Sequence, residues 1–243
     1  MSPLFTALTV LYVIWLAALL LVAYTPRWFK HYTLFKAVNS ILFVVIAVAA
    51  SQPPAAPENP LWPRLLAFSF AAFGDIAIGV ANNRHGSANA SRSASGLAGV
   101  AFFCAAHIFY LLWFAAFIPL RWYHFILPLL ALLAMLRVTS SPSFHFSRRI
   151  RPAAIFYYMV VTLMFSVGLQ LAFACPTPSL LMSYRTPVCG WALGLGVALF
   201  LLSDLLMLPL YFYTRRKCPH WVRFVNLVTY YTAQLLLALC PIL

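Results

Sequence analysis

Acidic residues are almost absent from this sequence. Its 243 residues include only three, Glu58, Asp75 and Asp204, and charged residues of both signs make up 8% of the chain. A soluble domain carries about 25% charged residues, so this chain has too few to cover a water-facing surface. With 64% hydrophobic residues, the composition is typical of a helical protein that crosses a membrane several times and has lipid as its outer solvent.

Motifs that mark common hydrolases and metal sites are absent as well. The sequence contains no Gly-x-Ser-x-Gly, no His-Glu-x-x-His and no Cys-x-x-Cys. It therefore lacks the usual signals of a serine hydrolase of the α/β-hydrolase type and of a zinc site.

Long apolar runs indicate the fold. A membrane-spanning helix needs about 17 or more predominantly apolar residues, and eight runs meet that length. We therefore predict an all-α, polytopic membrane bundle of eight transmembrane helices in a single domain, residues 1–243. The fifth run is short, and Pro128 interrupts it. The eight predicted spans are Leu4–Tyr24, Leu34–Ser51, Leu61–Ala81, Leu97–Ile118, Trp122–Val138, Ala153–Ala174, Val188–Phe212 and Trp221–Leu243.

The basic residues indicate how these spans are oriented. Of the 16 Lys and Arg residues, 13 flank the loops after the first, third, fifth and seventh spans, and only Arg64, Arg121 and Arg185 lie on the other side. Positively charged loops stay in the cytosol, so both termini are predicted on the non-cytosolic side. A net charge of +13 first suggests nucleic acid as a partner. Because the charges lie between apolar spans, we expect anionic membrane lipid instead, and no nucleic acid.

Two of the three acids lie inside predicted spans, Asp75 in the third and Asp204 in the seventh. A charge inside the bilayer is expensive, so an acid there indicates a functional site. Two carboxylates in one apolar cavity should not both be ionised, and such a pair supplies an acid and a base near neutral pH. Proton or cation translocation also uses buried carboxylates. A structural link from each Asp to Lys36, His107 or a tyrosine is a further alternative.

Other polar residues lie at similar depths. His107 is a candidate proton shuttle or orienting group for one Asp, although a lone helical histidine is often only a packing residue. Lys36 is a candidate to hold a lipid phosphate or to extend its ammonium to the membrane surface. Polar groups from six spans thus collect in the predicted cytosolic half, and the other half has almost none, which favours an enzyme open to one leaflet over a carrier. The remaining candidate substrate-binding or supporting residues are Asn39, Tyr157, Ser203, Tyr230, Tyr231 and Gln234.

Four short motifs follow one another along these spans: Phe73-Gly74-Asp75, Ala106-His107-Ile108-Phe109-Tyr110, Leu199-Phe200-Leu201-Leu202-Ser203-Asp204 and Thr229-Tyr230-Tyr231-Thr232-Ala233-Gln234. In this order the set resembles the lysoplasmalogenase family of membrane proteins (YhhN-like, or transmembrane protein 86). The resemblance covers about Lys36 to Leu239. One departure is that the family often has Trp-Arg shortly after the methionine of the sixth span, whereas Met164 is followed by Phe165-Ser166-Val167.

The resemblance implies hydrolysis of the vinyl-ether bond of a lysoplasmalogen, an alkenyl-glycerophosphoethanolamine or -choline, to a fatty aldehyde and a glycerophospho-alcohol. This chemistry needs one protonated carboxyl and one carboxylate, as in glycosidases, so Asp75 and Asp204 are the implied catalytic residues and no metal or organic cofactor is expected. A lysophospholipid is the implied substrate. The implied location is the endoplasmic reticulum membrane of a eukaryote or the inner membrane of a bacterium. The alternative from another class is a proton-coupled transporter or lipid-handling protein that uses the same two acids.

Five cysteines are present, and only Cys175 and Cys189 flank a predicted non-cytosolic loop. In an oxidising compartment this pair is a candidate disulfide, worth about 3 kcal/mol in the chain-entropy model.

The basic asymmetry makes a direct prediction about topology. A reporter protein fused after Leu243 should read as non-cytosolic, and one placed in the loop 82–96 as cytosolic, because positively charged loops are retained on the cytosolic side. Reporters that are active in only one compartment measure this. A cytosolic reading after Leu243 would overturn the predicted orientation.

Overall fold

A computed structural model describes residues 3–51, 61–86, 90, 93–148, 150–174, 187–213 and 219–240. Apart from one isolated bridge between Phe144 and Tyr213, the regular structure of these residues is helical. Eight helical segments among them are long and apolar enough to cross a membrane. The helices are α1 (Pro3–Tyr24), α2 (Tyr32–Ala49), α3 (Leu61–His85), α5 (Ala94–Ala115), α6 (Ile126–Thr139), α7 (Ile150–Ala174), α8 (Pro187–Tyr211) and α9 (His220–Leu239), and the 3-10 turns η1 (Phe29–His31) and η2 (Trp122–Phe125) precede α2 and α6.

The all-helical class and the number of spanning segments predicted from the sequence are confirmed, and they agree with a multi-pass membrane protein. Predicted and observed ends differ by a few residues. The third span was predicted to stop at Ala81, but α3 continues to His85, because a helix need not end where its apolar run ends. Pro128 does not break the fifth span. It lies in the first turn of α6, where its missing N–H leaves no helical hydrogen bond unmade, and η2 completes the segment.

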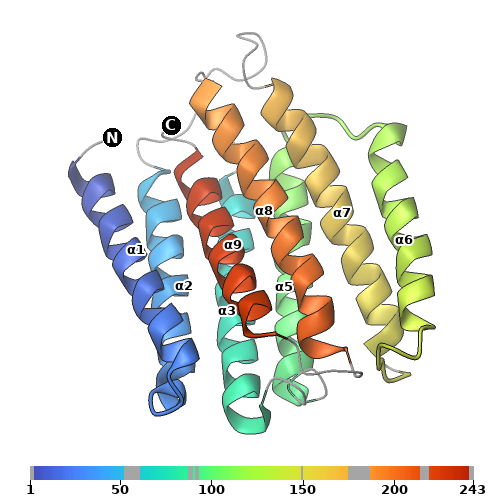
Figure 1. Cartoon of the computed structure of the whole chain (residues 1–243). Helices are drawn as coiled ribbons and strands as arrows, with labels where there is room; N and C mark the ends of the chain where they lie inside the picture. The colour runs from blue at the N-terminus through green and yellow to red at the C-terminus, as the bar shows by residue number, and fades with distance from the viewer. Residues whose placement is uncertain are drawn as a thin grey trace.

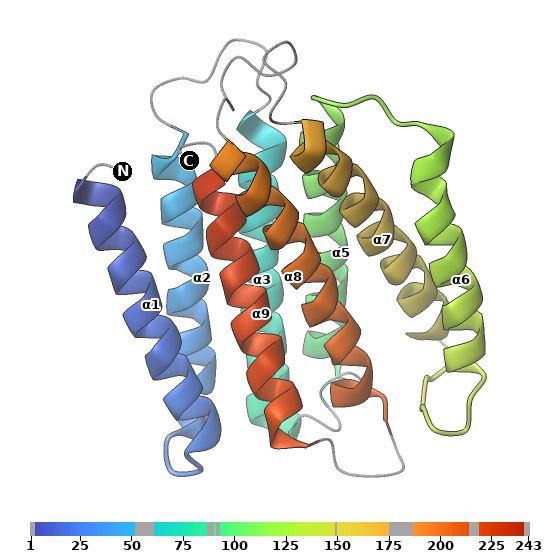
Figure 2. The ribbon, with the colours of Figure 1, turned by 45° about the horizontal axis from the view of Figure 1, so that its top comes forward.

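Six of the helices pack in a closed ring. Its packing order is α2, α3, α5, α7, α8, α9 and back to α2, while α1 packs outside against α2 and α9, and α6 packs outside against α7. The two outer helices therefore lie at opposite edges of the molecule (Figure 1, Figure 2). Both carry exposed apolar side chains, such as Ile14 (58% exposed) and Leu129 (56% exposed). In a membrane these faces contact lipid, and the ring encloses the polar residues described below.

Close packing within the ring depends on glycine at two helix contacts. Lipid removes much of the hydrophobic gain of helix association, so membrane helices rely on van der Waals contact through small residues. An added Cβ at Gly99 on α5 would lie 2.6 Å from Ile78 on α3, and one at Gly168 on α7 would lie 2.8 Å from Val197 on α8. These glycines bring together the helices that carry the candidate site.

The two termini lie at the same end of the bundle (Figure 1). The last residues of α1, α3, α6 and α8 lie at the opposite end, with the exposed basic residues Arg27, Lys30, Arg84 and Arg148 at or just beyond helix ends there. We call this the basic end. Its placement in the cytosol stays a prediction.

The cysteine pairing expected from the sequence involves Cys175, which lies outside the described residues. Cys189 instead lies beside Cys240: the two sulfur atoms are 2.8 Å apart, and both side chains are buried. Cys189 lies in the first turn of α8 and Cys240 directly follows α9, so this contact joins the two helices at the end where the termini lie.

We predict that mild oxidation of the purified protein links Cys189 to Cys240, because only a small movement brings their sulfur atoms to the disulfide bond length of about 2.05 Å. Peptide mapping by mass spectrometry without reductant should find the linked peptides, and Cys240→Ser should abolish them. Cys104→Ser is the matched control and should leave the link intact. Recovery of a Cys175–Cys189 peptide instead would contradict this prediction and favour the sequence expectation.

Candidate active site

The interior of the ring holds the polar residues that the sequence indicated. Both carboxylates lie nearer the basic end: counted along their helices at about 1.5 Å per residue, Asp75 is roughly 15 Å and Asp204 roughly 10 Å from it. All of these side chains are buried. Each ring helix contributes at least one of them, including Lys36 from α2, Asp75 from α3, His107 from α5, Tyr157 from α7, Asp204 from α8 and Tyr230 from α9.

Asp75 accepts hydrogen bonds from three side chains. Lys36 Nζ lies 2.5 Å from Oδ1, the Ser40 hydroxyl 2.6 Å from Oδ2 and the Tyr231 hydroxyl 3.3 Å from Oδ2. Lys36 and Ser40 are four residues apart, so one face of α2 presents both. Tyr231 is held in turn by α1, where the Tyr12 hydroxyl donates to its carbonyl oxygen at 2.7 Å. Asp75 is thus arranged as the anion of a buried ion pair.

Because both side chains are buried, each charge depends on the other for its neutralisation. Asp75 is 0% exposed and Lys36 is 5% exposed, so neither charge can be transferred to water without opening the ring. Removing one partner of a buried pair leaves an uncompensated charge and typically destabilises a protein by about 3–5 kcal/mol. Lys36 therefore points inward to Asp75 and does not extend its ammonium to the membrane surface.

Asp204 has a different set of partners. The Tyr157 hydroxyl donates to Oδ1 at 3.0 Å, and His107 Nε2 lies 3.0 Å from Oδ2. The adjacent Tyr158 donates its hydroxyl to the backbone carbonyl of Asp204 at 2.6 Å. Two neighbouring tyrosines of α7 therefore hold one residue of α8 against the histidine of α5.

The contacts of His107 define where its protons lie. Nδ1 is 2.6 Å from the carbonyl oxygen of Phe103, and because a carbonyl only accepts, Nδ1 carries a proton. Two lone pairs facing each other would repel, so a second proton lies on His107 Nε2 or on Asp204 Oδ2. That contact is not aligned as a hydrogen bond. No other group among the described residues forms a hydrogen bond with either atom.

The two carboxylates form separate clusters. In the described structure, no hydrogen bond or ion pair joins Asp75 to Asp204. The geometry matches the structural alternative, in which each Asp is linked to Lys36, His107 or a tyrosine, because a basic partner stabilises a carboxylate and a second carboxylate does not. No group of three His, Cys, Asp or Glu side chains suited to a metal ion occurs in the described part of the chain.

Tyr230 lies between the clusters. Lys36 Nζ is 5.9 Å from the centre of its ring, the ring packs edge-to-face against Phe200, and Phe200 packs against His107. The Tyr230 hydroxyl is buried and has no hydrogen-bond partner among the described residues. Burying a hydroxyl without a partner is costly, so this atom is a candidate to bind a water molecule or a substrate oxygen.

Three predicted supporting residues hold helices together instead. Asn39 donates to a backbone carbonyl of α1 at 3.0 Å. Ser203 accepts from the Asn226 side chain at 2.9 Å, which joins α8 to α9. Gln234 accepts from the Tyr110 hydroxyl at 2.7 Å. In the described structure none of the three has a hydrogen bond to either carboxylate.

Sequence reasoning misses Ser40, and it places Tyr158 beside Tyr157 among the polar groups of the sixth span without predicting its contact with Asp204. The position of Ser40 was a usable signal, because it lies on the same helix face as Lys36 in an otherwise apolar span. No comparable signal marks the contact of Tyr158. Adjacent helical residues point roughly 100° apart, so only the packing of α7 on α8 shows that both tyrosines reach Asp204.

The expectation that the half of the bundle near the termini is almost free of polar groups is wrong. Arg64 is 3% exposed and donates to the Ser51 hydroxyl at 2.8 Å and to the Ala238 carbonyl at 2.7 Å. Its guanidinium also lies over the Trp113 ring, 5.4 Å from the centre. These contacts let the charge be buried. In the sequence, Arg64 lies near the start of a predicted span and was interpreted only as a residue that sets the orientation of that span.

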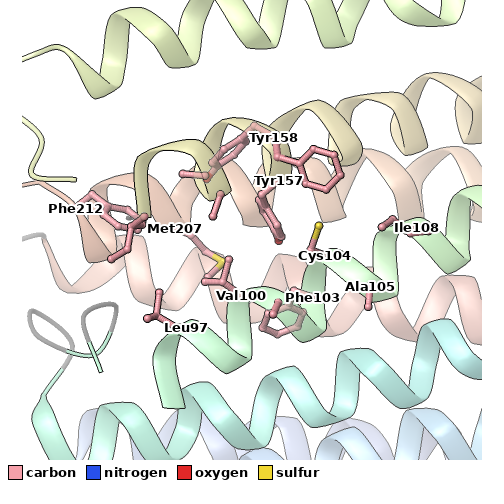
Figure 3. A pocket seen from close by; sticks show the side chains of 15 residues that line it. Leu97, Val100, Phe103, Cys104, Ala105, Ile108, Tyr157, Tyr158, Met207 and Phe212 are labelled. Atoms are coloured by element: carbon pink, nitrogen blue, oxygen red, sulfur yellow. The ribbon is translucent and has the colours of Figure 1, made fainter. Parts of the chain in front are cut away.

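An apolar groove of about 370 Å³ lies beside the Asp204 cluster, between α5 and α7 (Figure 3). Tyr157 and Tyr158 form part of its wall. Their rings therefore lie between the apolar groove and Asp204, whose carboxylate accepts from Tyr157 and whose backbone carbonyl accepts from Tyr158. The side chains along its outer edge are exposed, including Leu97 (41%), Ile108 (36%) and Phe156 (55%).

We predict that Lys36→Met destabilises the protein by about 3–5 kcal/mol, because it leaves Asp75 as an unpaired buried acid. Thermal unfolding in detergent measures the loss. Lys30→Met is the matched control, since Lys30 is exposed, and it should have little effect. The double change Lys36→Met with Asp75→Leu should recover much of the stability. If Lys36→Met unfolds at the wild-type temperature, the pair does not stabilise the fold.

Comparison with known protein families supports the resemblance seen in the sequence. The YhhN family matches residues 31–240. The matched region includes all six ring helices and both carboxylate clusters, and it leaves out α1. No curated protein and no solved structure matches the chain. Because the match covers most of its length, the protein belongs to the YhhN family, which contains lysoplasmalogenases.

Proposed function

We propose that this protein is a membrane ether hydrolase that cleaves the vinyl-ether bond of a lysoplasmalogen to a fatty aldehyde and a glycerophospho-alcohol. Family membership supports the reaction, because the YhhN family includes lysoplasmalogenases. The observation that carries the proposal is the pair of Asp204 and His107. His107 Nε2 lies 3.0 Å from Asp204 Oδ2 in a buried site beside an apolar groove, so the pair is placed to hold and transfer a proton.

The reaction begins with transfer of a proton to the alkene carbon farther from the ether oxygen. The other alkene carbon becomes an oxocarbenium-like cation, and water adds to it and loses a proton. The resulting hemiacetal then collapses: its hydroxyl loses a proton as the carbonyl forms, the bond to the glycerol oxygen breaks, that oxygen takes up a proton, and the aldehyde is released. One water is consumed, and the catalytic proton is returned. An acid and a carboxylate divide this work as they do in glycosidases.

The different partners of the two acids suggest different roles. Asp204 shares its proton with His107 Nε2 and has an oxygen without an aligned hydrogen bond, so we assign proton delivery to this pair. Asp75 accepts from Lys36, Ser40 and Tyr231, so we assign it the negative charge that faces the developing cation. Tyr230, between the clusters, is our candidate to position the attacking water.

The remaining features of the proposal follow from the chemistry and the setting. Protonation and hydration of a vinyl ether need no metal and no organic cofactor. The substrate is a lysophospholipid within the membrane, with its headgroup at the basic end of the bundle. The host membrane is the endoplasmic reticulum in a eukaryote or the inner membrane in a bacterium.

A proton-coupled transporter or lipid-handling protein is the second candidate, and one observation favours it. Polar groups extend beyond the carboxylate clusters toward the termini, through the Tyr110–Gln234 pair and the buried Arg64. A carrier needs polar groups along a path to both faces. Purified protein in liposomes with a pH-sensitive dye distinguishes the two: a proton flux without aldehyde release would favour the carrier.

We predict that Asp204→Asn lowers aldehyde release from lysoplasmalogen by at least about 100-fold, the lower end of what general acid–base groups contribute. Asp75→Asn alone would leave the Lys36 ammonium buried without its anion. The role of Asp75 is therefore tested in the double variant Asp75→Asn with Lys36→Met, which should also lose most of the activity. Combining both changes with Asp204→Asn should cost little more, because residues that act as one unit are not additive.

The third acid supplies the matched control. Glu58 lies outside the described residues, and Glu58→Gln should retain the wild-type rate. His107→Ala should be milder than Asp204→Asn and should shift the pH profile of the rate, because it removes the base that shares the proton of Asp204. A folded Asp204→Asn protein that releases aldehyde at the wild-type rate would exclude Asp204 from the mechanism.

A further inference from the structure

The groove between α5 and α7 makes a prediction about how the substrate reaches the site. Resting on the proposed function, we propose that this groove binds the alkyl chain of a single-chain phospholipid, which moves in sideways from the leaflet at the basic end. The chain would then lie along the wall formed by Tyr157 and Tyr158, with its head end near Asp204.

The groove is built for a hydrocarbon chain. Its lining is almost wholly apolar: Figure 3 shows Leu97, Val100 and Ile108 on α5 facing Tyr157 across the space. Leu97, Ile108 and the α7 residue Phe156 are also exposed at its edge. Both helices are of membrane-spanning length, so this edge faces lipid, and a chain can pass from lipid into the groove without entering water.

The length of the groove matches one leaflet. Leu97 lies three residues after the start of α5, and Ile108 lies eleven residues farther on, roughly 16 Å along the helix. The hydrocarbon core of a bilayer is about 30 Å thick. The groove therefore begins near the basic end and reaches to about the middle of the membrane, which is the depth occupied by the tail of a lipid in that leaflet.

Basic residues follow the groove lining at the basic end of the bundle, where a phosphate headgroup would lie. Ile150 lines the groove at this end, and Arg151 follows it. The Arg151 guanidinium donates to the hydroxyls of Thr139 and Ser140 at 3.0 and 2.8 Å. These acceptors are uncharged, so they orient the guanidinium and leave its positive charge for an anion. The exposed Arg148 lies close by in sequence.

The groove leads to Asp204 and not to Asp75. The Tyr157 hydroxyl contacts the Asp204 carboxylate, and the Tyr158 hydroxyl contacts its backbone carbonyl, while both rings line the groove. The donors to Asp75 come from α2 and α9, and neither helix contributes to the lining. A chain in the groove thus lies one tyrosine ring away from the acid to which we assign proton delivery.

Photo-crosslinking tests the groove without any turnover. The probe is a saturated 1-O-alkyl lysophosphatidylethanolamine with a diazirine in mid-chain, which has no vinyl ether to cleave. In liposomes containing the purified protein, mass spectrometry should find the crosslinks on α5 and α7, within 97–108 and 150–158. A two-chain phospholipid with the same diazirine is the control for contact with bulk lipid. This control lipid should label all lipid-exposed faces, including that of α1, and should show no preference for the groove residues of α5 and α7.

Filling the groove tests its use in the reaction. Ala105 and Ala153 line the groove from α5 and α7, and we expect Ala105→Trp to reduce the groove crosslinks about tenfold and to raise KM about tenfold with little change in kcat. Ala153→Phe, from the opposite wall, is the second variant should Ala105→Trp not fold. Ala17→Trp is the matched control, since Ala17 is exposed on α1 at the other edge of the molecule.

The outcomes separate this inference from the proposed function. One outcome is that Ala105→Trp or Ala153→Phe removes the groove crosslinks while the wild-type protein releases no aldehyde from lysoplasmalogen. It would support the groove as a lipid site and overturn the proposed hydrolase activity. Aldehyde release with crosslinks only elsewhere, or with filled-groove variants that keep the wild-type KM, would overturn the groove alone. The same loss of crosslinking in Ala17→Trp would also overturn it.

Discussion

The ion pair between Lys36 and Asp75 is the interaction on which the interior of this protein depends. An acid in a membrane-spanning helix is tolerated only where the bundle supplies a partner, and the two side chains lie 2.5 Å apart with almost no exposure. Ser40 and Tyr231 occupy the other carboxylate oxygen. These contacts fix α2, α3 and α9 relative to one another, and Tyr12 extends the same network to α1.

The second acid is held in a less rigid way. The Lys36 ammonium contacts the Asp75 carboxylate directly, and Ser40 and Tyr231 hold the other carboxylate oxygen, so the Asp75 cluster is a closely held ion pair. His107 Nε2 and Asp204 Oδ2 lie 3.0 Å apart, and their contact lacks hydrogen-bond alignment. In the proposed hydrolysis, the Asp75 cluster supplies the anion and the His107–Asp204 pair delivers the proton. The same two elements occur in proton carriers, which is why aldehyde release and proton flux are both informative.

Tyrosine separates the apolar and polar parts of the molecule. A tyrosine ring packs against apolar groups, while its hydroxyl needs a partner. Tyr157 and Tyr158 present their rings to the groove and their hydroxyls to Asp204. This arrangement keeps the acid out of lipid and places it one ring away from a hydrocarbon chain. Because the YhhN match covers both helices that form the groove, the groove lies within the part of the chain shared with the family.

The sequence by itself determined the all-helical class, the number of spans and the identity of the buried acids. Hydropathy and the cost of a charge in lipid depend only on the order of residues along the chain. The sequence also indicated which six spans carry polar residues. Only the tertiary structure decided which base meets which acid, since that depends on the order and rotation of helices around the ring. For this reason the sequence did not show that Asn39, Ser203 and Gln234 join helices. Nor did it show the contacts of Ser40, Tyr158 and Arg64. The groove likewise depends on how α5 and α7 diverge and which side chains fill the space between them, which no periodicity in either helix describes.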